Sequence, residues 1–302
     1  GAEGRQPMAT VVAGATSMSG RAIGQVLPGG RLHLADGPID LVIGCDGRAA
    51  ARQAAFSAAI ARFDGLLDAL CAELPLLRRP VGKCARETPS PALPHKGGRS
   101  TQPHSTPIPS PLWGGDWGGD CQSHPTSDTA LSLEGEGGGN CTAGRMIAAV
   151  APFAARGEFI TPMAAVAGAV AEEILAAMTA AATLARAYVN DGGDIALHLS
   201  HGRSYAVGLV DRPDRPSLFA RATIGWRDPS RGIATSGWRG RSFSLGIADA
   251  VTVLAASAAA ADAAATMIAN AADIDHPAIG RLPAREVKDD SEWADERVGA
   301  DA

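Results

Sequence analysis

The sequence predicts an α+β fold in which a mainly antiparallel sheet packs against helices, with a disordered internal insertion. Several short apolar runs lie on either side of turns that contain Gly, Pro or Asp, a pattern typical of strands joined as hairpins. Residues 48–78 instead repeat large apolar residues mostly at three- and four-residue spacing, which indicates one buried face of a helix. Residues 86–142 follow neither period and are rich in Pro, Gly, Ser and Thr, which favours a disordered insertion.

The amino-terminal part begins with a small, glycine-rich stretch. We expect residues 1–29 to be a flexible segment, because the Gly14–Gly20 run has neither the glycine spacing of a dinucleotide-binding loop nor the lysine of a P-loop. Two β-type runs, Arg31–Leu34 and Ile39–Cys45, then surround an Asp-Gly-Pro break and predict a hairpin. Residues 1–8 contain no apolar run, so the sequence indicates no signal peptide there.

The helical and irregular segments together suggest one domain with an interruption. We predict a single domain formed by residues 30–85 and 143–284, with the Pro/Gly-rich insertion at 86–142 and a charged tail at 285–302. A structureless run of this length inside a compact domain is unusual. A long surface insertion nevertheless costs little additional loop-closure entropy, so the fold can tolerate it.

The second part of the domain is expected to combine strands with two further helices. Thr161 and Pro162 form a helix start signal, with proline at the first helical position. Ser257 is expected to cap an alanine-rich helix that ends near residue 271, and Pro75 to close the earlier helix. Apolar runs predict further strands at Ser204–Val210, Ser217–Ile224, Gly232–Trp238, Ser242–Leu245 and Ala250–Ala255.

The strongest candidate for a binding site is a strand–turn–strand segment around two adjacent glycines, Gly192 and Gly193. Both can adopt positive φ and carry no Cβ, so another molecule can approach the backbone closely. Asn190, Asp191 and Asp194 place amide and carboxylate oxygens around that backbone. The segment therefore predicts either a site for a polar ligand or an ordinary hairpin turn, because Asn-Asp-Gly-Gly suits both.

A second candidate site lies on the last predicted helix. Asp262 and Thr266 are four residues apart, so the carboxylate and the hydroxyl project from one face. Oxygen ligands of this kind suit a hard cation such as Mg²⁺. Such a pair is also common on solvated helices, but here the neighbouring residues are alanines, and a carboxylate buried among alanines needs a partner.

Charge and composition exclude several functional classes. The net charge of −5 over 302 residues argues against a sequence-independent nucleic-acid binder, which needs a basic face. Five cysteines without a C-x-x-C pair favour neither a disulfide framework nor a zinc site, and a reducing cytoplasm fits best. The longest apolar stretch, residues 247–272, contains Asp249 and Asp262, which would penalise a membrane span.

The order of these motifs resembles the UPF0280 family, relatives of the ApbE-like flavin transferases. The resemblance covers about residues 28–80 and 144–283. The runs that carry it are Gly37–Leu41, Thr161–Glu173, Val189–Leu197, Ala234–Gly237 and Asp249–Ala269.

The resemblance implies a ligand, a metal and their sites. ApbE-like proteins use Mg²⁺ and FAD to attach FMN to a Ser or Thr of an acceptor protein, so a flavin or nucleotide ligand is implied and an acceptor protein is left open. Asp262 and Thr266 match the side-chain metal ligands, and Ala164 occupies the position of the backbone carbonyl donor. The residues that resemble walls of the nucleotide pocket are Gly192, Gly193, Asp194, Thr235, Ser236 and Gly237.

Two departures from the family pattern define the alternatives. Ala167 stands where the ApbE-type lysine is expected, and Arg239 and Arg241 occur where a histidine-bearing segment usually precedes the last strand. Guanidinium groups of this kind can bind phosphate. The leading hypothesis is a Mg²⁺-dependent enzyme that acts on the pyrophosphate of FAD or a related nucleotide. The alternatives are a flavin- or nucleotide-binding module without turnover, and a structural or partner-binding protein.

Overall fold

The computed structural model describes residues 22–81, 141–210, 217–240, 244–283, 286 and 297–299. The predicted insertion at 86–142 lies outside the described residues except for its last two, Cys141 and Thr142. These two belong to the folded domain, because Cys141 is the N-cap of a helix that begins at Thr142. Most of the predicted tail at 285–302 also lies outside the described residues.

The main sheet is antiparallel throughout, as the sequence predicts. Neighbouring strands pair in the order β1-β2-β3-β4-β5-β8-β9, and two tight hairpins, β2–β3 and β4–β5, lie at its centre. The strands are β1 (Ile23–Leu27), β2 (Arg31–Asp36), β3 (Ile39–Asp46), β4 (Arg186–Asp191), β5 (Asp194–Leu199), β8 (Gly232–Ser236) and β9 (Val251–Ala255).

Strand β1 corrects the last part of the predicted flexible segment at residues 1–29, of which residues 1–21 lie outside the described residues. Ile23–Leu27 pairs along its length with β2 and forms one edge of the sheet. Ile23 and Val26 remain more than half exposed. The strand therefore lacks the buried, alternating side chains that would have made it visible in the sequence.

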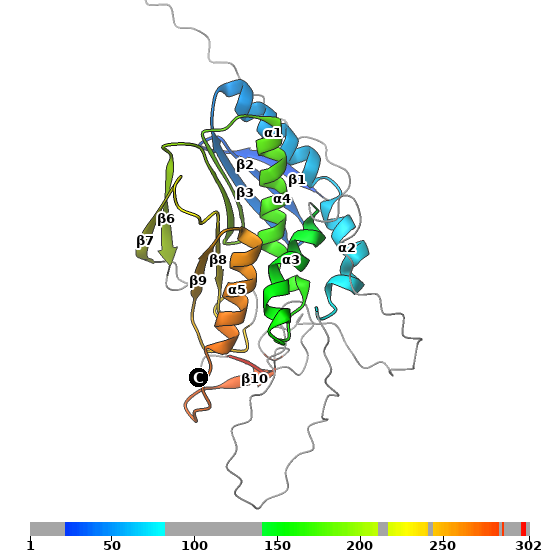
Figure 1. The fold of residues 1–302 in the computed structure, drawn as a ribbon, viewed down its shortest axis with the longest axis vertical. Helices are drawn as coiled ribbons and strands as arrows, with labels where there is room; N and C mark the ends of the chain where they lie inside the picture. Colours follow the sequence, from blue (N-terminus) through cyan, green and yellow to red (C-terminus); the bar gives the residue numbers. More distant parts are fainter. Residues whose placement is uncertain are drawn as a thin grey trace, which may run out of the picture.

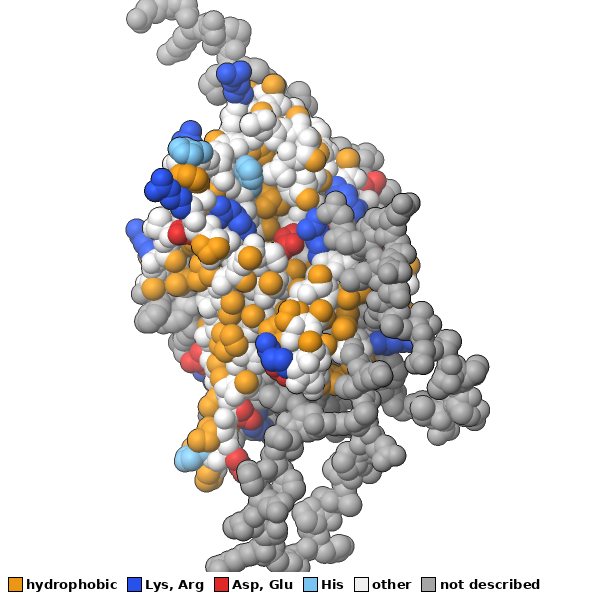
Figure 2. Space-filling model, viewed as in Figure 1, with side chains coloured by type: hydrophobic (Ala, Val, Ile, Leu, Met, Phe, Trp, Pro, Cys, Tyr) orange, Lys and Arg blue, Asp and Glu red, His pale blue; other side chains and the backbone are white. Residues whose placement is uncertain are grey.

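The helices cover one face of the sheet, with α4 at the centre of the layer (Figure 1). Their ranges are α1 (Ala49–Phe63), α2 (Leu66–Leu77), α3 (Thr142–Ala155), the 3₁₀ turn η2 (Pro162–Ala165), α4 (Val166–Ala181) and α5 (Ala258–Ala271). Seen from this side, apolar side chains gather over α3 and α5, with few charged groups among them (Figure 2).

Two helix boundaries differ from the predictions. The segment 48–78 is two helices, because Gly65 adopts a left-handed conformation with φ 74° between them, and Pro75 lies inside α2 rather than closing the segment. The helix expected after Thr161 begins as a 3₁₀ turn and becomes α-helical only at Val166, and the Thr161 side chain makes no capping bond. Ser257 does cap α5, since its hydroxyl accepts a hydrogen bond from the amide of Ala260 at 3.2 Å.

Helix α4 is the core helix of the domain. With η2 it forms a 20-residue apolar segment with a mean hydropathy of 1.5, long enough by length and composition to cross a membrane. More than half of this segment is buried inside the protein, and α4 packs against α1, α3, α5, β4 and β5. Its composition is thus explained by core packing. A cytoplasmic location without membrane or nucleic-acid partners stays a prediction.

A separate two-stranded hairpin, β6 (Ser204–Val210) with β7 (Leu218–Gly225), packs on the other face of the main sheet. Ile224 of this hairpin forms an apolar cluster with Leu197, Leu199 and Ile233, whereas Ala196 of the same strand β5 belongs to the helix-covered core. Successive strand residues point to opposite faces, so β5 is covered on both sides.

Two smaller differences concern the carboxy-terminal part. Ser244 and Leu245 were expected in a strand, but both lie in an irregular segment, where the Asn270 side-chain oxygen accepts hydrogen bonds from the Ser244 hydroxyl and the Leu245 amide, each at 3.1 Å. In the predicted charged tail, Arg297–Gly299 forms a short strand, β11, that pairs with β10 (Arg281–Pro283).

A buried ion-pair network joins the helices. The Glu173 carboxylate on α4 accepts hydrogen bonds from Arg62 of α1 at 2.7 Å and from Arg145 of α3 at 3.1 Å. The side chain of Glu173 is 9% exposed and that of Arg145 is 18% exposed, so neither group is fully hydrated. Three helices are thereby held in register by one carboxylate.

Replacing Glu173 with alanine is therefore expected to reduce the free energy of unfolding by roughly 2 kcal/mol, because Arg145 keeps its charge but loses a partner away from water. The partial exposure of Arg62 keeps the cost below that of a fully buried pair. Urea unfolding of the variant measures the effect. Glu158→Ala, which removes an exposed carboxylate paired with Arg156, should change stability by less than about 0.5 kcal/mol; equal effects of the two substitutions would contradict the assignment.

Candidate functional site

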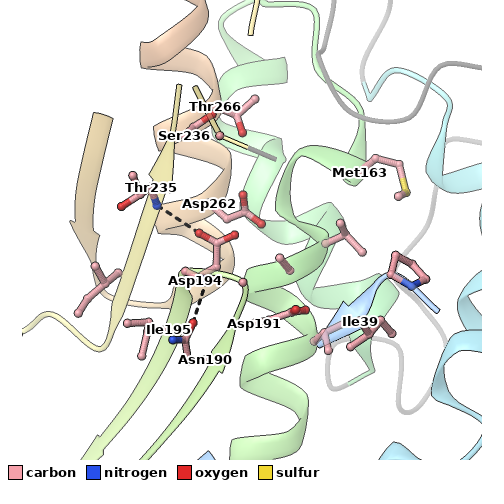
Figure 3. Close-up of a pocket in the computed structure, with 18 of the residues that line it drawn as sticks. Ile39, Met163, Asn190, Asp191, Asp194, Ile195, Thr235, Ser236, Asp262 and Thr266 are labelled. Carbon is pink, nitrogen blue, oxygen red and sulfur yellow. Dashed lines mark hydrogen bonds between the residues drawn. The ribbon is translucent and has the colours of Figure 1, made fainter. Parts of the chain in front are cut away.

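A cavity of about 940 Å³ opens where the β4–β5 turn, the end of β8, the beginning of α4 and the middle of α5 meet (Figure 3). It brings together four segments that are separated in the sequence. Nine of the predicted site residues line it: Asn190, Gly192, Gly193, Asp194, Thr235, Ser236, Gly237, Asp262 and Thr266.

Ala164 is the predicted site residue that does not line this cavity. Its side chain is completely buried in the core, while Met163, Val166 and Ala167 on either side of it do face the cavity. The proposed role of Ala164 concerns its backbone carbonyl, and that role stays a prediction.

The β4–β5 turn positions the first group of polar atoms. Gly192 and Gly193 have φ of 61° and 122°, conformations that a residue with a Cβ rarely adopts. The side-chain oxygen of Asn190 accepts a hydrogen bond from the Gly193 amide at 2.8 Å and so closes the turn. A Cβ at Gly193 would meet no atom within 4 Å, so the backbone of this turn borders open space.

The end of β8 is tied to this turn. The Asp194 carboxylate accepts a hydrogen bond from the Thr235 amide at 3.2 Å, and the hydroxyls of Thr235 and Thr252 lie 2.9 Å apart. Gly237 has φ 152° and passes so close to the segment before β9 that a Cβ would lie 2.4 Å from the carbonyl oxygen of Asp249. Glycine is required there, and the Thr-Ser-Gly turn is therefore held in one conformation.

Helix α5 supplies the carboxylate and the hydroxyl from one face, as predicted. Asp262 and Thr266 are both buried, and a carboxylate oxygen of Asp262 accepts a hydrogen bond from the Gly168 amide at 3.1 Å. The side chains of Asp194 and Asp262 point toward one another across the cavity (Figure 3). The two helices and the β4–β5 turn thus converge on one acidic region.

In the acidic region, burial and the neighbouring carboxylates disfavour the ionised form of Asp262. Burial raises the pKa of Asp262 well above its ordinary value, and the carboxylates of Asp194 and Asp191 raise it further, while hydrogen bonds from the Gly168 and Ala167 amides lower it. Asp191 is itself buried and accepts a hydrogen bond from the Asp40 amide at 3.3 Å. Among the described residues that line the cavity, none is Lys, Arg or His.

The oxygen-bearing side chains at this end of the cavity fit a hard cation better than an anion that binds without one. They offer carboxylate and hydroxyl oxygens, and a positive charge would relieve the repulsion among the three aspartates. In the described part of the chain, no group of three or more His, Cys, Asp or Glu side chains is arranged to hold a metal by itself. Mg²⁺ suits such an incomplete set, because it is usually bound through one or two carboxylates together with substrate phosphates.

Several cavity residues carry no recognisable signal in the sequence. One wall is formed by apolar residues of α2, and another by residues 207–210 of β6. Asp191 was named as part of the polar turn, but it was not included among the expected residues of the nucleotide pocket or the metal site. Arg239, considered as a phosphate ligand, instead bonds the Asp249 carboxylate at 2.8 Å and lies over the Trp238 ring; Arg241 lies outside the described residues.

The geometry defines a class of protein: an α+β protein with an antiparallel sheet and a cavity that has an acidic end and many apolar lining residues, of a volume within the range of small-molecule sites. A family model described as "AbpE bacteria" matches residues 24–107 and 121–302. The chain therefore belongs to this ApbE-like family.

Curated relatives agree with the family assignment. The chain is 44% identical over 133 residues to a UPF0280 protein of Methanopyrus kandleri, covering 43% of this chain and 51% of that protein. It is 37% identical over 134 residues to a UPF0280 protein of Methanothermobacter thermautotrophicus, covering 43% of this chain and 50% of that protein. The aligned region thus spans about half the length of the curated relatives.

Proposed function

We propose that the protein binds FAD or a related nucleotide together with Mg²⁺ in this cavity and acts on the nucleotide pyrophosphate. One observation carries the proposal: two glycine-containing turns and the Asp262/Thr266 pair, which are separated in the sequence, line the same cavity. Membership of the ApbE-like family supports a flavin-related function in general.

In this proposal the two turns form the walls of the nucleotide site. The Gly192–Gly193 backbone borders open space, so a phosphate or a ring can approach it without meeting side chains. Thr235 and Ser236 add hydroxyl groups on the facing side. The hydrogen bond from the Thr235 amide to Asp194 fixes the spacing between the two turns.

Asp262 and Thr266, with the backbone carbonyl of Ala164, would hold the metal ion. When bound, Mg²⁺ neutralises the pyrophosphate and polarises it for attack. The protein's own contribution is to keep the carboxylate of Asp262 buried and oriented by the Gly168 amide. In a transfer reaction, a Ser or Thr hydroxyl of an acceptor protein would bond to the FMN phosphorus, and AMP would leave; in hydrolysis, water would take the place of the hydroxyl.

A binding function without turnover is the second candidate. Ala167 lines the cavity where the resemblance to ApbE-like proteins places a lysine. None of the described lining residues is a lysine or histidine that could act as a base. A structural or partner-binding protein is the third candidate, which would leave the cavity without a flavin or nucleotide ligand.

One assay separates these candidates. The purified protein is incubated with FAD, with and without Mg²⁺, and FMN and AMP are separated by chromatography while binding is followed by flavin fluorescence. We expect Mg²⁺-dependent formation of FMN and AMP, and loss of both in Asp262→Ala. Binding without product would support the second candidate, and the absence of any flavin or nucleotide binding would overturn the proposal.

A further inference from the structure

The cavity has two chemically different ends. Asp194, Asp262 and Thr266 lie together at one end, whereas Ile39 and Met163 lie on the other side, toward α2 (Figure 3). Oxygen-bearing side chains dominate the first end. The proposed roles of the nucleotide turns and of the metal ligands use only this end, and leave the α2 side without a function.

The α2 wall is apolar along its whole length. Leu67, Leu70, Leu74 and Leu77 all line the cavity, and their spacing of three or four residues places them in one stripe along the helix. From Leu67 to Leu77 the helix rises by about 15 Å. Other aliphatic residues also line the cavity, namely Pro38, Ile39, Met163, Val166 and Val170. The Asp191 carboxylate lies beside Ile39 (Figure 3), where it accepts a hydrogen bond from the Asp40 amide, and marks the boundary with the acidic end.

This wall offers a bound group almost no hydrogen bonds. Most backbone amides and carbonyls in the middle of a helix are bonded within the helix. The exception in α2 is the Cys71 carbonyl, because Pro75 has no amide hydrogen to donate to it. The one polar side chain of α2 that lines the cavity is the Cys71 thiol, a weak donor. Any polar atom placed against the stripe would lose its water without gaining a partner. The occupant must therefore be uncharged and free of hydrogen-bonding groups.

We propose that the α2 side of the cavity binds a linear aliphatic group, carried by a ligand whose phosphate lies at the acidic end. No aromatic side chain occurs among the described lining residues, so a flat ring has nothing to stack on. A flavin ring would also leave its polar edge unpaired if it were laid along the leucine stripe. An aliphatic chain has no polar atoms to satisfy and can follow a narrow apolar wall.

The test is a homologous series of n-alkyl phosphates, from butyl to decyl, titrated into the 302-residue protein by calorimetry with and without Mg²⁺. Each methylene that enters the apolar compartment is expected to raise the affinity about fourfold. The gain in affinity per methylene measures binding of the chain at the α2 side. The effect of Mg²⁺ on the affinity of the whole series measures binding of the phosphate at the acidic end. An affinity independent of chain length would overturn the inference.

Two substitutions on α2 provide a matched comparison. Leu74→Glu places a charge in the stripe and should reduce the increment to less than about twofold per methylene. Leu76→Glu makes the same change on the same helix at a residue that is 36% exposed and does not line the cavity, and it should leave the increment unchanged. If riboflavin displaces decyl phosphate and Leu74→Glu, but not Leu76→Glu, weakens riboflavin binding, the α2 side holds a ring and the inference fails.

This inference and the proposed function can fail separately. Suppose that FAD binding depends on Mg²⁺ but the affinity for alkyl phosphates does not change with chain length. This result would refute the aliphatic compartment and leave the flavin proposal standing. If the affinity rises with alkyl chain length but the protein binds no flavin or nucleotide, the aliphatic compartment is supported and the flavin proposal is refuted.

Discussion

Replacing Gly168 with alanine is expected to destabilise the protein by about 3 kcal/mol or more and to abolish ligand binding at the acidic end. A Cβ at Gly168 would lie 2.3 Å from the carbonyl oxygen of Ala258 and 2.7 Å from the amide nitrogen of Ala259. Both are backbone atoms at the start of α5, so no side chain can rotate away, and α4 and α5 must separate. Overpacking that moves backbone costs at least the upper part of the usual range.

The close contact between α4 and α5 at Gly168 also positions the Asp262 carboxylate. The Gly168 amide donates to Asp262, so moving α4 away from α5 also displaces the carboxylate that would hold the metal. Urea unfolding measures the loss of stability, and flavin fluorescence measures binding. Gly47→Ala is the control, since its Cβ would lie 3.5 Å from Leu184, an ordinary contact. A Gly168→Ala protein as stable as the Gly47→Ala protein would show that the helices do not approach this closely.

Replacing Asp262 with asparagine is expected to have opposite effects on stability and on binding. The pKa of Asp262 is raised in the folded protein, chiefly by burial and then by Asp194. A raised folded pKa gives a contribution to stability that is fully present below the unfolded pKa, about 3.9 for Asp, and is lost as the pH rises through the folded value. Without metal, the ionised carboxylate therefore opposes folding at neutral pH.

The metal-free Asp262→Asn protein should consequently melt at a higher temperature than the wild type at pH 7, and the difference should shrink as the pH falls toward 4. Each unit of raised pKa corresponds to about 1.4 kcal/mol, and each kcal/mol to about 2–4 °C in a domain of this size. Added Mg²⁺ should stabilise only the wild type. Removing a metal ligand should weaken Mg²⁺-dependent nucleotide binding by at least about 100-fold.

Differential scanning fluorimetry between pH 4 and pH 8, with EDTA or with Mg²⁺, measures these effects. Asp275→Asn removes the same charge from an exposed position after α5 that does not line the cavity, and it should change the melting temperature at pH 7 by less than about 2 °C. A destabilised Asp262→Asn protein in EDTA would mean that the carboxylate makes a favourable contact as an anion, and would contradict the account of strain.

Much of the fold could be read from local patterns. The hairpins around Gly37 and around Gly192 were predicted because turn residues separate apolar runs, and Ser257 was predicted as a cap because a polar residue precedes an alanine-rich helix. The separate strand Ile23–Leu27 was missed because its side chains are half exposed. The division of segment 48–78 at Gly65 was missed because apolar periodicity continues across it.

The candidate site was predictable in part for a similar reason. Polar residues in a glycine turn and a carboxylate among alanines are unusual locally, so Asp194 and Asp262 could be selected without a structure. Leu67, Leu70 and Leu74 could not, because a leucine that lines a cavity has the same helical spacing as a leucine in the core. The pairing of Arg239 with Asp249 could not be predicted either, because it is a contact between residues ten apart in an irregular segment.

The sequence by itself determined most of the segments that form strands and helices, because turn chemistry and side-chain periodicity act over a few residues. It also determined which oxygen-bearing side chains are out of place in an apolar context. Only the tertiary structure decided that these side chains share one cavity and that an apolar wall of α2 continues it. The physical reason is the crossing of α4 and α5 at Gly168, a contact between residues about ninety positions apart.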